Sequence, residues 1–260
     1  MAQLPTLIGV AAADGDFERV ERWLAGGTAS HPRSVTDVDD DGWTLLTWIA
    51  ISDESTPEHV EFARDLISRG CPVDAQSSGP GPDRGHTALH CACESPGGAA
   101  AAIVALLVAA GANVNIQAEG GSGRRTTPLF SILEASASTL DIVTTLLRAG
   151  ASLDCDGPTR SFEERLNEIA GSRTEHGVAI RNLVASVRAA GSWKAHCRLP
   201  HKQILRLRSL VARGRAKLPR ARRRSPRDRG VRQERALEFV ARQGDNGIVW
   251  NILSFWRATY

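Results

Sequence analysis

The chain has 260 residues, 42% of them hydrophobic and only 5% aromatic, with a formal net charge of +3. This composition favours thin layers of helices over a thick β-sandwich core. The sequence has no apolar run of about 18 residues, the length that a membrane-spanning helix needs, so we expect no membrane span. The apolar segment near the N-terminus is not preceded by basic residues, and we therefore expect no secretory signal.

The small net charge hides two regions of opposite charge. Residues 191–260 carry 18 Lys and Arg against 4 Asp and Glu, whereas the first 190 residues carry 14 against 25. An imbalance of this size indicates two parts with different roles.

The cysteines are scattered along the chain and odd in number, which predicts reduced thiols in an intracellular protein, cytoplasmic or nuclear. They are Cys71, Cys91, Cys93, Cys155 and Cys197.

A helix–turn–helix unit recurs along the first 190 residues. Each copy opens on a threonine followed two residues later by Leu or Ile, at spacings of 38, 43 and 40 residues. These threonines are Thr6, Thr44, Thr87 and Thr127. Each copy closes on a glycine after its second apolar helix. These glycines, with one from a fifth unit, are Gly27, Gly70, Gly111, Gly150 and Gly191. A recurring period of this kind predicts a stack of structural repeats.

The units follow one another in chain order. The four that carry the threonine motif are expected at residues 4–28, 39–75, 85–115 and 124–154. In the second, Thr56, Pro57 and Glu58 predict the start of a helix. A fifth pair of helices, at 162–170 and 177–190, lacks the motif. We interpret it as a C-terminal cap, because the outer face of a terminal repeat must meet water.

Polar insertions rich in Gly, Pro and Ser lengthen these units. They lie at residues 53–57, 77–83 and 120–124. This composition is typical of loops, so we expect longer turns and undisturbed helical layers.

The third unit, GHTALHCACESPGGAAAAIVALLVAAGANVN, resembles an ankyrin repeat, whose pattern is roughly G-x-T-P-L-H-x-A-A, a second helix, then G-A-x-V-N. The resemblance implies an all-α ankyrin-repeat solenoid of four to five stretched units with short hairpin loops over residues 1–192. It also implies that His90 links neighbouring loops. The threonine can cap the first helix, and the closing glycine is expected to end the second in a left-handed conformation. Arg125 replaces a glycine of the pattern, so we expect a different backbone there.

Residues 193–260 are expected to form a basic helical C-terminal extension. We expect a break at Pro200, a helix at 201–213, a flexible Arg-rich linker near 218–230, and helices at 231–242 and 247–257. The last helix has a dense apolar face, which predicts either packing against the last repeat or docking of a partner.

A dense group of arginines in the linker permits three interpretations. It can be a solvated linker, a nuclear-localisation or nucleic-acid patch, or a docking segment regulated by phosphorylation of Ser225. The arginines are Arg220, Arg222, Arg223, Arg224, Arg227 and Arg229.

Catalytic and metal sites are not indicated. His86, His90, Cys91 and Cys93 offer metal-ligating side chains, but no second ligand pair lies at zinc-finger spacing. The Gly-rich segments lack the Lys and Ser or Thr of a phosphate-binding loop, and no G-x-S-x-G motif is present. We therefore expect no enzyme activity, no metal and no cofactor.

The resemblance implies a non-catalytic module or adaptor, monomeric, that binds another protein through its hairpin tips and first helices. Trp43 is expected to be an anchor of this surface. Carried over by position, the partner-binding residues are Asp40, Asp41, Trp43, Ser52, Asp83, Arg84, His86, Glu94, Ser95, Arg124, Thr126 and Glu134. Two alternatives involve the tail: a ubiquitin-ligase substrate adaptor, since its helices are faintly similar to an F-box or SOCS box, or a nuclear protein that binds nucleic acid.

Overall fold

The structure is a computed structural model. It describes residues 3–29, 32–81, 83–119, 125–133, 140–154, 161–168 and 175–212. Arg124, Glu134, the Arg-rich block and the two helices expected after residue 230 lie outside these residues.

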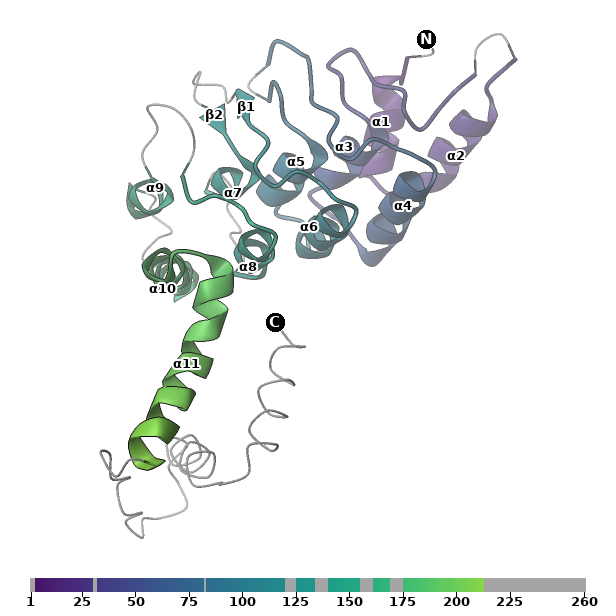
Figure 1. Ribbon diagram of the computed structural model, residues 1–260. Coiled ribbons are helices and arrows are strands. Elements are labelled where there is room, and N and C mark those ends of the chain that lie inside the picture. Colours follow the sequence, from purple (N-terminus) through teal and green to yellow (C-terminus); the bar gives the residue numbers. More distant parts are fainter. Residues whose placement is uncertain are drawn as a thin grey trace. The chain divides into compact units, whose positions relative to one another are not determined.

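Helices dominate the described residues and follow one another in pairs (Figure 1). The pairs are α1 (Thr6–Ala13) and α2 (Phe17–Ala25), α3 (Leu45–Ala50) and α4 (Pro57–Ser68), α5 (Ala88–Glu94) and α6 (Ala100–Ala109), α7 (Pro128–Ser131) and α8 (Leu140–Arg148), and α9 (Phe162–Glu168) and α10 (Glu175–Ala190). The expected all-α repeat architecture is confirmed.

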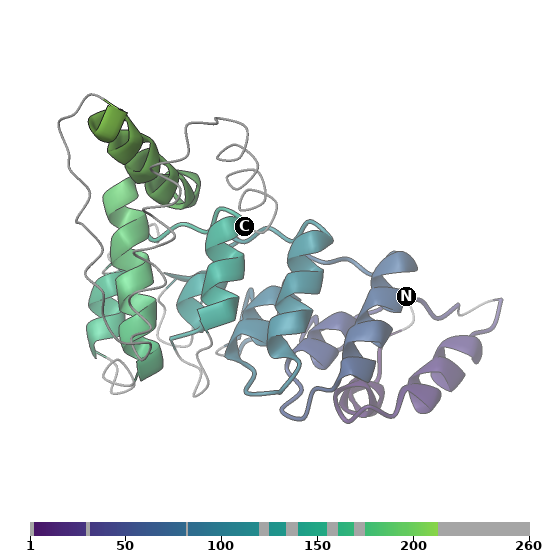
Figure 2. The same cartoon turned by 90° about the horizontal axis from the view of Figure 1, so that it is seen from below.

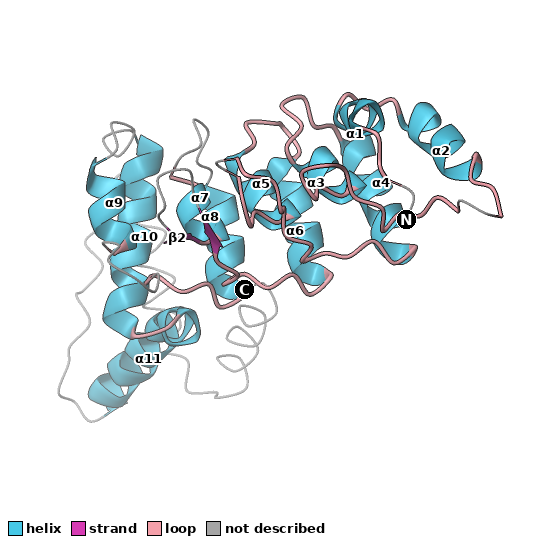
Figure 3. Ribbon diagram, turned by 90° about the horizontal axis from the view of Figure 1, so that it is seen from above, coloured by secondary structure: helices cyan, strands magenta, loops and turns pink. Residues whose placement is uncertain are grey.

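The first helices and the second helices form two layers (Figures 2 and 3). In one layer α1 packs on α3, α3 on α5, and α5 on α7; in the other α4 packs on α6 and α6 on α8. The core between them is made of small and medium aliphatic side chains, among which Leu46, Leu89, Ile103 and Leu107 are fully buried. No unit can bury its apolar face alone, so the core continues from one repeat to the next.

Threonines cap α3 and α5, as the sequence predicts, whereas α1 follows Pro5 and has Thr6 as its first residue. Thr44 Oγ1 accepts a hydrogen bond from the Thr47 backbone N–H at 3.2 Å. At α5 the Thr87 backbone N–H donates to His90 Nδ1 at 3.2 Å, and the Thr87 hydroxyl lies 3.0 Å from the same atom. These contacts satisfy N–H groups that have no partner within the helix.

The predicted left-handed glycine is confirmed at the ends of α4, α6, α8 and α10 but not at Gly27. Gly111, for example, has φ +91°, whereas Gly27 does not have a positive φ. Gly26 caps the end of α2 with φ −82°, and the Gly26 N–H donates to the carbonyls of Arg22 and Trp23. The Arg33 guanidinium also donates to the Trp23 carbonyl at 2.7 Å. The terminal carbonyls are thus satisfied without a left-handed turn.

A short antiparallel hairpin precedes α7. Strand β1 (Ala118–Glu119) pairs with β2 (Arg125–Thr126) in the register Ala118↔Thr126 and Glu119↔Arg125. Arg125 is therefore extended, whereas Gly42 and Gly85 before the two preceding helices have φ near +80°. The different backbone expected at Arg125 is confirmed.

The chain divides into two compact units, Met1–Ala185 and Ser186–Tyr260. In the second unit, α11 (Trp193–Ala212) runs through Pro200, so the predicted break there is wrong. Proline removes the hydrogen bond of its own nitrogen, and the turns on either side of Pro200 maintain the helix. Ser186 Oγ lies 2.9 Å from His196 Nδ1 near the start of this unit. Within the described residues, no helix is both long and apolar enough to cross a bilayer.

Candidate functional site

The loop before α3 is organised by the carboxylate of Asp39. Its Oδ1 accepts hydrogen bonds from the backbone N–H groups of Asp41 and Trp43, at 3.0 and 2.8 Å. Its Oδ2 accepts one from Trp48 Nε1 at 2.9 Å. Asp40 and Asp41 are exposed at the tip of this loop. Its backbone is therefore fixed, and two carboxylates face solvent.

Trp43 is half-buried rather than fully exposed. Its ring lies 5.1 Å from the ring of Trp48, at an interplanar angle of 57°. Trp48 in turn covers Gly9 of α1 so closely that a Cβ at position 9 would clash with the indole. Trp43 therefore has a supported face and a partly accessible one, which is compatible with an anchor residue.

The insertion at residues 77–83 packs on the preceding loop. The backbone N–H groups of Ser78 and Gly79 donate to the Asp41 carbonyl, at 2.8 and 3.0 Å. Farther along, the Gly85 N–H donates to the Ser77 carbonyl at 2.9 Å, and the Ser77 hydroxyl contacts the Asp83 carbonyl. The insertion is thus held at both ends.

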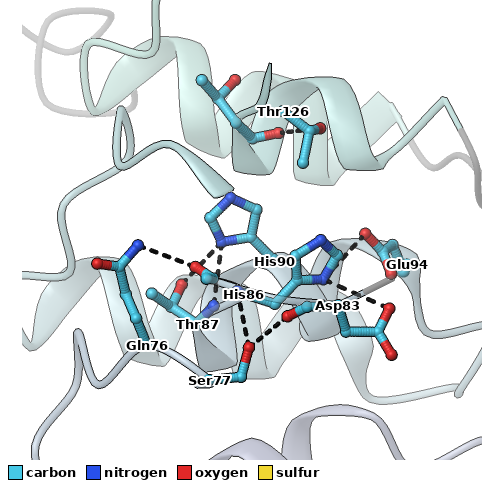
Figure 4. A network of polar contacts seen from close by, with 10 residues as sticks. Gln76, Ser77, Asp83, His86, Thr87, His90, Glu94 and Thr126 are labelled. Atoms are coloured by element: carbon cyan, nitrogen blue, oxygen red, sulfur yellow. Dashed lines mark hydrogen bonds and ion pairs between the residues drawn. The ribbon is translucent and has the colours of Figure 1, made fainter. Parts of the chain in front are cut away.

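His86 lies between two carboxylates beneath this insertion (Figure 4). Its Nδ1 is 4.0 Å from Asp83 Oδ1 and 3.7 Å from Glu94 Oε1, and the residue is only 4% exposed. The prediction that His86 contacts a partner is therefore wrong, because its side chain is buried. Within the described residues, Asp83, His86 and Glu94 could hold a metal, since one ligand atom from each lies within 4.8 Å of the others.

His90 stacks against His86 with ring centroids 5.0 Å apart and an interplanar angle of 19°. Its Nδ1 accepts from the Thr87 N–H, which places the proton of the neutral ring on Nε2. The backbone groups of Ile116 and Thr126, in the next loop, interact with the ring. Among the described residues His90 Nε2 has no hydrogen-bond partner of normal geometry, so these groups lie near the ring without forming the hydrogen-bonded link that the resemblance implies. Burial, reinforced by the charge of His86, lowers the pKa of His90 to about 3.

Ser52 and Ser95 are also buried, at 4% and 3% exposure, so the prediction that they contact a partner is wrong. The Ser52 hydroxyl donates to the Ala13 carbonyl at 2.6 Å, and the Ser95 hydroxyl donates to the Ser52 carbonyl at 2.7 Å. The Gly97 N–H then donates to Ser95 Oγ at 3.1 Å. These hydrogen bonds join three successive units.

The other described candidates remain at the surface. Arg84 is exposed, with its Nε 3.7 Å from the Glu119 carboxylate, while Asp83, Glu94 and Thr126 are half-buried. Together with Asp40, Asp41 and Trp43, they lie on the loops before the first helices and on those helices.

Two glutamines were not predicted and connect the hairpin tips. Gln76 Nε2 donates to the carbonyls of Gly85 and Gln117, at 3.0 and 3.1 Å. Arg125 donates to Gln117 Oε1 at 3.1 Å. A sequence signal for this pair exists, because each glutamine stands three residues after the valine of its closing motif, Val73 or Val114.

The geometry of these units agrees with a comparison against protein families. Residues 8–118 match the family model for ankyrin repeats in three copies. Residues 8–118 are therefore ankyrin repeats. A search of curated protein sequences found no match to the chain. The matched ankyrin copies begin within α1 and end in strand β1, while α7 and α8 continue the same two layers.

Three thiols within the ankyrin units are expected to resist modification. Cys71, Cys91 and Cys93 are buried, and burial raises the pKa of each, that of Cys71 to about 11. A rise from the ordinary 9.0 lowers the reactive thiolate fraction about a hundredfold. Labelling with iodoacetamide at pH 8, read by peptide mass spectrometry, should modify half-exposed Cys197 before these three. Labelling of the three buried thiols at the Cys197 rate in native protein would contradict this.

Proposed function

We propose that this protein is a non-catalytic binding module that holds a protein partner on its hairpin loops and the adjoining ends of its first helices. Ankyrin repeats generally mediate protein–protein interaction, and their fold alone does not identify the partner. The surface that we assign consists of Asp40, Asp41, Trp43, Asp83, Arg84, Glu94 and Thr126.

The observation that carries this proposal is the connection between successive tips. Asp41 bonds to the insertion of the next unit, and Gln76 bonds to the carbonyl of Gln117 in the unit after that. Loops fixed in this way lose little conformational entropy when a partner binds. Exposed charges at Asp40, Asp41 and Arg84 then provide specificity and steer association.

Replacement of Trp43 by alanine is expected to weaken partner binding while the helical content stays unchanged. Removal of an interface anchor typically costs about 2 kcal/mol or more, or roughly thirtyfold in affinity. The test is quantitative affinity purification from the native cell with full-length wild type, Trp43→Ala, Arg84→Glu and the control Arg148→Glu. Arg148 is exposed on the second helix α8 and belongs to neither the hairpins nor their first helices.

Partners that depend on this surface should be depleted by the first two variants and retained by the control. A loss of circular dichroism signal in Trp43→Ala would assign Trp43 to the core and remove it from the site. Equal recovery with all four proteins would contradict the hairpin surface. The ubiquitin-ligase and nucleic-acid alternatives depend on the tail beyond the described residues and stay predictions, as do the monomeric state and the intracellular location.

A further inference from the structure

A hollow of about 680 Å³ lies between the second helices of the first two units, α2 and α4. It is lined by Phe17, Glu18, Glu21, Pro57, Glu58, Glu61, Phe62 and Asp65. On α4 these positions recur at intervals of about four residues, so they share one face of the helix over about two turns. We call this hollow the α2–α4 groove.

The floor of the α2–α4 groove is aromatic and firmly supported. Phe17 and Phe62 stack with centroids 4.4 Å apart, and both are half-buried. The Phe17 and His59 rings also meet edge to face, with centroids 5.0 Å apart and an interplanar angle of 80°. His59 is fixed by Thr56, whose N–H donates to Nδ1 at 3.1 Å, and its Nε2 lies 3.1 Å from the Ala13 carbonyl. The floor therefore offers apolar surface whose side chains need not rearrange when a ligand binds.

The rim of the groove is acidic. Arg69 pairs with Glu21 and, at 3.0 Å, with Asp65. Arg64 lies 3.4 Å from Glu61, in a pair that is largely exposed. Glu18 and Glu58 form no ion pair with any residue that the structure describes. The rim therefore holds five carboxylates against two arginines.

Helix stability alone does not explain this charge. A carboxylate in the first turn stabilises its own helix, which accounts for Glu18 and Glu58 separately. The i,i+3 pair with Arg64 accounts for Glu61, but neither effect accounts for the convergence of these carboxylates around two half-exposed rings. A groove with an apolar floor and a negatively charged rim is complementary to an apolar side chain flanked by cations.

We propose that the α2–α4 groove docks a segment of a partner protein in which an apolar side chain is flanked by Arg or Lys. The apolar side chain covers the Phe17–Phe62 pair, and the flanking cations lie near Glu18, Glu58 and Glu61. This site is separate from the hairpin surface, because its lining comes from the second helices. It therefore provides a second contact beyond the proposed function and does not depend on it.

The proposal is tested on the full chain with a phage-displayed library of random 12-residue peptides as the probe. Enriched peptides should combine at least one large apolar residue with Arg or Lys. A synthetic copy of the most enriched peptide should lose about tenfold in affinity for the double variant Glu58→Gln/Glu61→Gln at low salt, and added salt should reduce the wild-type affinity. The matched control is Asp53→Asn/Glu54→Gln, which neutralises two exposed carboxylates in the loop before α4.

The control is expected to bind within about twofold of wild type, since screening limits the effect of distant exposed charges. Enrichment of peptides without basic residues, or equal losses in the two double variants, would overturn the proposal. So would occupation of the groove by this protein itself. A dimer that Glu58→Gln/Glu61→Gln dissociates, or carbodiimide crosslinks within a monomer from Glu58 or Glu61 to Lys202 or Lys217, would reveal that outcome.

Discussion

The free energy of unfolding is expected to fall as the pH is lowered from about 6.5 to about 3, and His90 should account for a separable part of this fall. The pKa of His90 is lowered to about 3, first by burial and then by the charge of His86. An unfolded histidine has a pKa near 6.5. Below pH 6.5 the unfolded chain therefore binds a proton that the folded chain does not take up until about pH 3, so acid favours unfolding throughout this interval.

The size of the effect follows from the same linkage. One proton bound in the unfolded state alone changes the free energy of unfolding by at most about 1.4 kcal/mol per pH unit. Over this interval the contribution of His90 is on the order of 4 kcal/mol. This is a large part of the stability of a typical domain.

The variant that isolates this contribution is His90→Gln. A glutamine three residues after the cap can accept from the Thr87 N–H as His90 does, and it does not titrate. Urea unfolding at pH 7.5, 6, 5 and 4 should show wild type more stable at pH 7.5, and the difference should shrink as the pH falls. A difference that stays constant across these values would mean that His90 is not kept neutral by the fold.

Much of the fold follows from local sequence, because its determinants act within one or two turns. Thr44 and Thr87 form the predicted caps with residues three positions later, and Gly111 supplies the predicted left-handed turn. Two local predictions were wrong, one because another contact replaced the local rule and one because a helix continued in spite of it. Arg33 satisfies a helix end that was expected to need Gly27, and α11 tolerates the hydrogen bond lost at Pro200.

The candidate site was less predictable, because exposure at the end of a short helix depends on the neighbouring unit. Ser52 and Ser95 stand at first-helix ends, where polar residues were expected to face a partner, yet each bonds to a carbonyl of the preceding unit. His86 was expected on the surface, but the insertion at 77–83 folds beside it and brings Asp83 to its ring. The length of that insertion is visible in the sequence, whereas its path is not.

Replacement of Gly97 by alanine is expected to destabilise the protein by about 3 kcal/mol, near the upper end of the cost of overpacking. A Cβ at position 97 would lie 2.7 Å from the Ser52 carbonyl oxygen and 3.0 Å from the Ser55 backbone nitrogen, and would clash with the Ser55 hydroxyl. Two of these atoms belong to the backbone of the preceding unit, which cannot move without breaking its hydrogen bonds to Ser95 and Ala99. Urea unfolding measures the loss.

The adjacent glycine provides the matched control. A Cβ on Gly98 would meet only the Ser55 carbonyl oxygen, at an ordinary 3.8 Å, so Gly98→Ala should change stability by no more than about 0.5 kcal/mol. Adding Ser55→Ala to Gly97→Ala removes the hydroxyl clash but leaves the Ser52 carbonyl in place, so only part of the loss should be restored. Full restoration would show that the hydroxyl alone excludes a side chain at position 97. Equal effects of the two glycine variants would show that the backbones of the second and third units are not in close contact there.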